Sequence, residues 1–223
     1  MTKRLRLFPL NAVLFPGALL NLHIFETRYK QMINECLESG EDFGVALIAE
    51  GAEAGDPNVT PHHVGSIAQI VDVQPLPLGR CFISTIGRQR FKIEKIVSRE
   101  PYLTVEAEII TEEGAHGDDE AELARRVREL FAQYAELIVE FSGEKAIGAL
   151  PDDAQGASFA IGDSLQIAEL VKQRLLELDS TKKRLLAEEI FLRQLLPQLR
   201  QLLERRRARP GMEKYFGSSF SPN

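Results

Sequence analysis

Two Phe-Pro pairs near the N-terminus constrain this chain more than any other feature. Phe8-Pro9 and Phe15-Pro16 bracket a short apolar segment. Proline fixes its own φ and has no N–H to donate to a sheet, so each pair must lie at a strand end, a sheet edge or a corner. The spacing therefore predicts that the chain turns at both places.

The residues that follow predict a strand and then, directly, a helix. Leu20, Leu22 and Ile24 alternate with polar residues and so share one face of a strand. After Glu26, apolar residues recur at helical spacing and make a single stripe. That stripe consists of Tyr29, Met32, Ile33, Cys36 and Leu37. The predicted order is strand, corner, strand, helix.

The same stretch closely resembles the start of the N-terminal domain of the ATP-dependent Lon proteases, where the pattern is roughly LPLFPL, VLFPG, LPL, IFE, RY and M with short gaps. The matching residues are Leu7, Phe8, Pro9, Leu10, Val13, Leu14, Phe15, Pro16, Gly17, Leu22, Ile24, Phe25, Glu26, Arg28, Tyr29 and Met32. The resemblance continues through Phe43-Gly44-Val45, Val64-Gly65, Gly79-Arg80, Arg90-Phe91 and Pro101-Tyr102-Leu103. The resemblance covers the first half strongly and the second half loosely.

The resemblance implies an α+β fold, in which a PUA-like antiparallel β pseudobarrel with one inserted helix is followed by an all-α helical lobe. Residues 1–114 are expected to form the β lobe, 115–206 the helical lobe and 207–223 a flexible tail. A charged, glycine-containing stretch between Glu112 and Glu122 has no strand pattern and is the expected hinge.

Periodicity predicts the elements on either side of this hinge. Before it, short strands are expected at 43–49, 67–73, 80–86, 91–97 and 103–109, with Gly87 separating two of them and a long mobile loop at 51–65. After it, helices are expected over 123–141, 158–178, 181–188 and 192–203. Pro197 is expected to kink the last helix or to mark its start.

Composition fits a folded chain that has no membrane anchor. The 223 residues are 44% hydrophobic, and no stretch reaches the ~20 apolar residues of a spanning helix. Cys36 and Cys81 are expected to pack as small apolar side chains, and a cytoplasmic location is expected. The net charge of -6 argues against nucleic acid as a partner, because the positive charge that drives phosphate binding is missing.

The sequence contains no recognisable catalytic, cofactor or metal motif. The string nearest to a phosphate-binding loop, at Gly143-Glu144-Lys145, lacks the leading glycine and the following hydroxyl. His62 and His63 are adjacent, so their side chains would point to opposite sides of an extended loop and make a poor shared metal site. We therefore expect a protein that is not an enzyme, with no cofactor and no metal.

What remains is surface recognition by the residues of the family motif. The candidate binding residues are Phe15, Pro16, Phe25, Arg28, Arg90 and Phe91. The arginines combine an apolar stem with a fork for carboxylates, but pairing of Arg28 with Glu26, or of Arg90 with Glu94, would explain them structurally. Phe15 would offer a docking point if part of it is exposed, although an aromatic beside proline often plugs the end of a barrel.

The leading hypothesis is a non-catalytic, stand-alone relative of the Lon N-terminal domain. It would bind client polypeptide, or a protease complex, in a cleft between the β lobe and the first long helix. The alternative is an RNA-binding role, which rests on analogy among PUA-like folds alone. The sequence does not indicate an oligomeric state.

The missing motifs predict that the purified chain hydrolyses neither ATP nor peptide bonds. Phosphate release and cleavage of a labelled unfolded protein should both stay at the level of a buffer blank. Turnover of ATP that persists unchanged through further purification would contradict this prediction.

Overall fold

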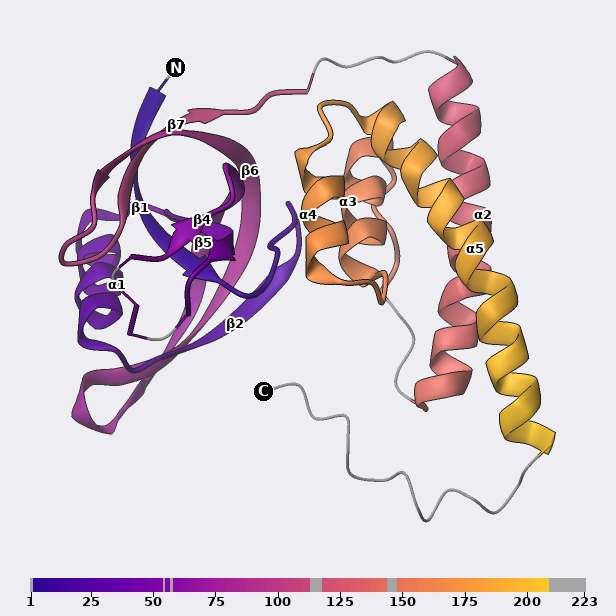
Figure 1. The fold of residues 1–223 in the computed structure, drawn as a ribbon, viewed down its shortest axis with the longest axis horizontal. Coiled ribbons are helices and arrows are strands. Elements are labelled where there is room, and N and C mark those ends of the chain that lie inside the picture. Colours follow the sequence, from indigo (N-terminus) through magenta and orange to yellow (C-terminus); the bar gives the residue numbers. More distant parts are fainter. Residues whose placement is uncertain (1, 54, 57, 113–117, 144–147, 209–223) are drawn as a thin grey trace.

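The computed structural model describes residues 2–53, 55–56, 58–112, 118–143 and 148–208. Over these residues, seven strands and one helix form a β lobe, and four further helices form a second lobe (Figure 1). This confirms the α+β class and the order of a β lobe followed by a helical lobe. Residues 113–117 of the expected hinge and the tail beyond residue 208 lie outside the described residues, and the end of the expected hinge belongs to the first helix of the second lobe.

The β lobe contains β1 (Thr2–Leu10), β2 (Leu19–Ile24), α1 (Thr27–Ser39), β3 (Phe43–Glu50), β4 (Thr60–Pro61), β5 (Val64–Leu76), the 3₁₀ turn η1 (Pro77–Gly79), β6 (Arg80–Ser98) and β7 (Thr104–Ile109). The helical lobe contains α2 (Asp118–Ser142), α3 (Ala154–Ser164), α4 (Glu169–Glu177) and α5 (Thr181–Ala208). Among the described helices, none combines the length and apolarity needed to cross a bilayer.

Strand pairing closes the β lobe into a ring. The strands follow one another in the order β1, β7, β6, β5, β3, and β1 returns to pair with β3. That closing pair is parallel, and every other pair is antiparallel, as expected for the lobe as a whole. Inside the ring, the fully buried Phe91 packs against the backbone of Gly44 and Gly65. Closure removes most of the open strand edges that an isolated sheet would have.

Both Phe-Pro pairs lie where the chain turns or loses a partner strand. β7 pairs with β1 only as far as Arg6, so Pro9 faces a partner strand on one side alone, at Ala46 of β3. Pro16 opens a tight turn in which the N–H of Ala18 donates to the carbonyl of Phe15 at 3.1 Å. Such a turn requires a positive φ at its third residue, and Gly17 has a φ of +83°.

This turn docks on Gly87 in the middle of β6. The Gly17 N–H donates to the Gly87 carbonyl at 2.8 Å, and the Gly87 N–H donates to the Ala18 carbonyl at 2.9 Å. A β-carbon on Gly87 would lie 2.1 Å from the Phe15 oxygen. Gly87 therefore does not separate two strands, as the sequence suggested. It lies inside one long strand, where the Phe15 turn approaches too closely for any side chain.

Three other element boundaries differ from expectation. The predicted helix over 158–178 is two helices, because buried Leu165 takes an extended backbone and the Tyr134 hydroxyl accepts the Gln166 N–H at 2.8 Å. The two predicted final helices are one, and α5 passes through Pro197 with Leu192 and Leu196 both buried before it. The region 51–65 contains β4 and the start of β5, and Val59 within it is buried.

One apolar core joins the two lobes. Phe15 and Val13 extend from the second Phe-Pro corner into a cluster with buried residues of all four helices of the second lobe. Phe15 is fully buried, its ring lies 6.4 Å from that of Phe159, and it packs over Gly162 of α3. The corner that the sequence placed at a barrel end is thus the apolar plug between the lobes.

The turn geometry predicts which glycines tolerate a side chain. Gly17→Val should lower the free energy of unfolding by about 1–3 kcal/mol, because a β-branched residue is strained at positive φ. Gly87→Ala should cost about 1–3 kcal/mol through the clash with the Phe15 carbonyl. Gly148→Ala is the matched control, since its β-carbon meets nothing within 4 Å.

Denaturant unfolding followed by circular dichroism measures all three variants. The control should stay within about 0.5 kcal/mol of the parent. If Gly87→Ala were as stable as the control, the docking of the Phe15 turn on β6 would not contribute to the fold.

Candidate functional site

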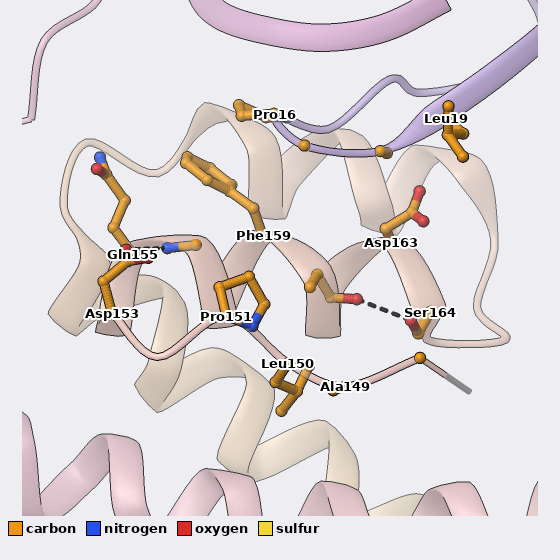
Figure 2. A pocket seen from close by; sticks show the side chains of 15 residues that line it. Pro16, Leu19, Ala149, Leu150, Pro151, Asp153, Gln155, Phe159, Asp163 and Ser164 are labelled. Atoms are coloured by element: carbon orange, nitrogen blue, oxygen red, sulfur yellow. Dashed lines mark hydrogen bonds between the residues drawn. The ribbon is translucent and has the colours of Figure 1, made fainter. Parts of the chain in front are cut away.

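The junction between the lobes is hollowed into a cleft of about 610 Å³. One wall is the turn that leads into β2, and the other is α3 with the segment that precedes it. Figure 2 shows Pro16 and Leu19 on the first wall and Phe159 and Asp163 on the second. The described residues that line the cleft are Pro16, Gly17, Ala18, Leu19, Gly148, Ala149, Leu150, Pro151, Asp153, Gln155, Gly156, Phe159, Ala160, Asp163 and Ser164.

The spacing of small residues on α3 explains why this place is hollow. Gly156, Ala160 and Ser164 are four residues apart and so share one face of the helix. With no large side chain on that face, the helix leaves room beneath the Pro16 turn. The start of α3 is fixed by the Asp153 carboxylate, which accepts the Gly156 N–H at 2.6 Å. The Ser164 hydroxyl donates to the Ala160 carbonyl at 2.8 Å and so is satisfied within the helix (Figure 2).

The cleft is mainly apolar, and the charges that line it are negative. Among its described lining residues, Asp153 and Asp163 carry carboxylates and there is no Lys or Arg. Burial raises the pKa of Asp163, and the nearby charge of Lys172 opposes that shift. An apolar segment, neutral or flanked by positive charge, is the ligand chemistry that such a lining favours.

Phe159 forms the floor of the cleft and connects it to a buried ionic cluster. The Arg184 guanidinium lies 3.8 Å from the centre of the Phe159 ring, and that of Arg90 lies 5.4 Å from it. A second hollow of about 290 Å³ begins on the other side, because Pro16, Gln155 and Phe159 line both spaces. Phe159 therefore lines the cleft and also contacts the guanidinium groups of the buried Arg90 and Arg184.

The ionic cluster ties β6 and the end of the β lobe to the helical lobe. Glu112 accepts hydrogen bonds from both terminal nitrogens of Arg184, at 2.8 and 3.2 Å, and from the Thr181 hydroxyl at 2.6 Å. Arg90 also pairs with Glu112 and donates to the carbonyls of Leu176 and Leu178 in the helical lobe. The charged side chains of Arg90, Glu112 and Arg184 are exposed by only 2%, 4% and 0%.

A polar chain continues from this cluster into α5. The Arg184 Nε donates to the Ser158 hydroxyl at 2.8 Å, and that hydroxyl donates to the Glu188 carboxyl at 2.9 Å. The second oxygen of Glu188 is buried and has no partner among the described residues. Four ionisable groups are therefore enclosed at the junction, where water cannot compensate a missing partner.

The pKa values of the two carboxyl groups of this cluster shift in opposite directions, although burial acts on both. Burial alone would raise the pKa of Glu112, but hydrogen bonds from Arg184 and Thr181 and the charges of both arginines hold that pKa below its usual range. At Glu188, burial raises the pKa well above the usual range, against the opposing effects of Ser158 and Arg184. Glu112 is thus the carboxylate that neutralises the arginines.

The structure separates the six predicted binding residues into four groups, the last of which is Arg28 alone. Phe15, Arg90 and Phe91 are buried and serve the interlobe plug, the ionic cluster and the barrel interior respectively. Pro16 alone lines the cleft. Phe25 is 53% exposed on the surface of the β lobe, away from the described lining of the cleft.

The Arg28 side chain is held by hydrogen bonds within the β lobe. Its Nε pairs with Glu26 at 2.9 Å, as one reading of the sequence anticipated, and its terminal nitrogens donate to the backbone carbonyls of Glu53 and Asp56. Arg28 therefore holds part of the 51–65 region that was expected to be mobile. Arg90 does not pair with Glu94, because its partner is Glu112 and Glu94 pairs with Lys92.

Sequence reasoning missed most of the cleft. The cleft lies against α3 and the 148–153 segment, and not against the first long helix as expected. Phe159 and Asp163 fall within the helix that was expected over 158–178, and neither was among the candidate binding residues. The small residues at 156, 160 and 164 were the available signal, but spacing alone does not show that they face a second lobe. Within the described residues, no cluster of His, Cys, Asp and Glu has the arrangement of a metal site.

Comparison with known proteins identifies the family to which this chain belongs. The sequence pattern of the ATP-dependent protease La (LON) substrate-binding domain matches residues 4–194. The chain belongs to the Lon substrate-binding domain family. Among its relatives, the Lon protease of Flavobacterium johnsoniae is 26% identical over 181 residues, and that of Desulforamulus reducens is 28% identical over 178 residues. These alignments cover 79% and 78% of this chain but 22% of each relative.

Solved structures of Lon N-terminal domains have the same fold. A Lon N-terminal domain protein from Xanthomonas campestris superimposes with a TM-score of 0.61 at 25% identity, and covers 82% of this chain and 95% of that one. The N-terminal domain of the Lon protease from Mycobacterium avium complex gives a TM-score of 0.62 at 19% identity, which shows the fold alone. The Lon resemblance seen in the first half of the sequence is therefore confirmed.

The ionic cluster predicts a large loss of stability when Glu112 is neutralised. Glu112→Gln should lower the free energy of unfolding by about 3 kcal/mol or more, because two arginines would remain buried without a counter-charge. Since the pKa of Glu112 is lowered on folding, its contribution is present above the unfolded pKa and is lost as the pH falls through the folded pKa. Chemical denaturation at neutral and acidic pH measures both effects.

The control for this variant is an exposed ion pair. Glu94 lies 3.2 Å from Lys92, and the two side chains are 42% and 57% exposed. Glu94→Gln should change stability by less than about 1 kcal/mol. Equal losses in the two variants would mean that the cluster contributes no more than a surface pair.

Glu188 predicts the opposite dependence on pH. Because its pKa is raised on folding, its favourable contribution is complete below the unfolded pKa and declines as the pH rises toward the folded pKa. As the pH rises from the usual glutamate value of 4.5 toward neutral, Glu188→Gln should therefore lose less stability than the parent does. Thermal melts of both proteins across this range test it, and parallel curves would show that Glu188 does not titrate there.

Proposed function

We propose that this Lon-family domain is a non-catalytic module that binds apolar segments of client polypeptides in the interlobe cleft and presents them to a protease. Membership of a substrate-binding domain family supports the binding role. The cleft is the observation that supports this choice of site. Apolar groups from both lobes surround a space of about 610 Å³, and Leu19 at its rim is 70% exposed.

The size and lining of the cleft favour a short extended segment over a folded surface. A space of this size accommodates a few side chains, and its polar groups are few. Burial of apolar area supplies the affinity in such a site, so many different sequences can bind. A domain that samples unfolded clients needs this low selectivity.

The first experiment is a titration of a permanently unfolded protein, such as reduced and carboxymethylated lactalbumin, followed by fluorescence anisotropy. Ala160→Trp fills the cleft from α3 and should weaken binding by about tenfold. Leu19→Asp places a charge at the apolar rim and should weaken it in the same direction. Leu78→Asp is the matched control, because Leu78 is 86% exposed and lies outside the described lining of the cleft.

Circular dichroism and thermal melts confirm that each variant is folded before its binding is interpreted. The control should bind within about twofold of the parent. If folded Ala160→Trp bound the unfolded protein as well as the parent does, the cleft would not be the binding site.

A parallel titration with an RNA hairpin tests the alternative. Binding of the unfolded protein should change little between low salt and about 150 mM salt, because apolar contacts are not screened. RNA affinity would instead fall steeply with salt through counterion release. Salt-sensitive RNA binding together with no binding of the unfolded protein would favour the RNA-binding role.

A further inference from the structure

Strand β2 has an open edge beside the cleft. It pairs with β6 along residues 19–24, and the described part of the chain supplies no strand for its other edge. Every other described β-lobe strand except the short β4 has at least two partner strands. An open edge presents unpaired N–H and C=O groups that a second polypeptide can complete.

The ladder geometry identifies the backbone groups that face outward. Hydrogen-bonded pairs alternate along an antiparallel ladder, and the Gly87 N–H donates to the Ala18 carbonyl at 2.9 Å. The same alternation directs the backbone of Leu20 and Leu22 toward β6. The backbone N–H and C=O groups of Asn21 and His23 therefore face the open edge.

Exposed aromatic side chains lie on and beside β2, with Phe82 contributed by the paired strand β6. Phe25 and Phe82 are 53% and 46% exposed, and the His23 ring lies between them, 5.5 Å and 4.7 Å from their ring centres. Cross-strand contacts with aromatic residues stabilise a strand that is added to a sheet. The edge thus offers hydrogen bonds to a backbone and an apolar surface to its side chains.

The hollows at the two ends of β2 favour a basic occupant. The interlobe cleft begins at Leu19, and a separate hollow of about 280 Å³ is lined by residues 21–26 of this region together with Phe8, Leu10, Tyr29 and Glu53. Among the described lining residues of both hollows, the acidic side chains are Asp153, Asp163, Glu26 and Glu53, and there is no Lys or Arg. Charge complementarity therefore selects an apolar segment flanked by Lys or Arg.

We propose that a client segment bound in the cleft continues along β2 and adds to its open edge as a β-strand, with apolar side chains over His23 and Phe25 and basic residues near the two acidic hollows. This inference rests on the proposed polypeptide-binding function and adds to it the conformation and the flanking charge of the client. Affinity then comes from the client backbone as well as from its side chains.

The test uses a short peptide of sequence KVTVTVK and two N-methylated forms of it. Alternate residues of a strand direct their N–H groups to opposite edges, so methylation of all valines and methylation of all threonines remove opposite sets of donors. One methylated peptide should bind about tenfold more weakly than the parent peptide, and the other should bind within about twofold of it. The acidic peptide EVTVTVE should also bind more weakly.

Amide hydrogen exchange of the full chain, measured residue by residue by NMR, locates the contact without any protein variant. Saturation with KVTVTVK should slow exchange at Asn21 and His23 by about tenfold, while Leu22, already bonded to β6, should change little. Equal binding of the two methylated peptides, or exchange at Asn21 and His23 that the peptide does not alter, would overturn the proposal.

Binding of the unfolded protein distinguishes a failure of the strand-addition proposal from a failure of the proposed function. If it binds and Ala160→Trp weakens it, but KVTVTVK does not bind or leaves the β2 amides unprotected, then the strand addition is wrong and the cleft remains the site. If neither the unfolded protein nor the peptide binds, both proposals fail.

Discussion

The pairing of one buried carboxylate with two buried arginines holds this molecule together. Glu112 lies at the end of the β lobe, Arg90 comes from β6 and Arg184 from α5, so a single set of charges joins three distant parts of the chain. Charges this deeply buried are stable only with full partners, and the enclosing carbonyls and hydroxyls supply them. The lobes are therefore held in a defined relation by groups that tolerate little displacement.

The interlobe cleft is a consequence of that relation. Phe15 plugs the junction between the lobes, and Phe159 packs against the arginines on one side while its other side faces the cleft. Small residues on α3 then leave a space that neither lobe could enclose alone. Any change that alters the ionic cluster should reach the cleft through the Phe159 ring, which ties stability and ligand binding to the same contacts.

Much of the fold could be read from local pattern. The Phe-Pro corners, the stripe from Tyr29 to Cys36, and the long apolar period of α2 were predicted where they occur, because proline geometry and helical spacing are properties of neighbouring residues. The predictions were less accurate at positions where segments distant in the sequence pack together. Gly87 was interpreted as a strand break because its docking partner, the Phe15 carbonyl, is far away in sequence. Pro197 was expected to kink the last helix or to mark its start, and it lies within the single helix α5.

By itself, the sequence determined the α+β class, the order of the lobes and the Lon-family motif, since each depends on local periodicity or on an extended run of matching residues. Only the tertiary structure decided what the motif residues do. Arg90 and Phe91 are neighbours in one strand, yet alternation sends one to the ionic cluster and the other into the barrel. The partners of both, and the hollow between the lobes, come from segments separated by many residues, and no local pattern encodes which of these will meet.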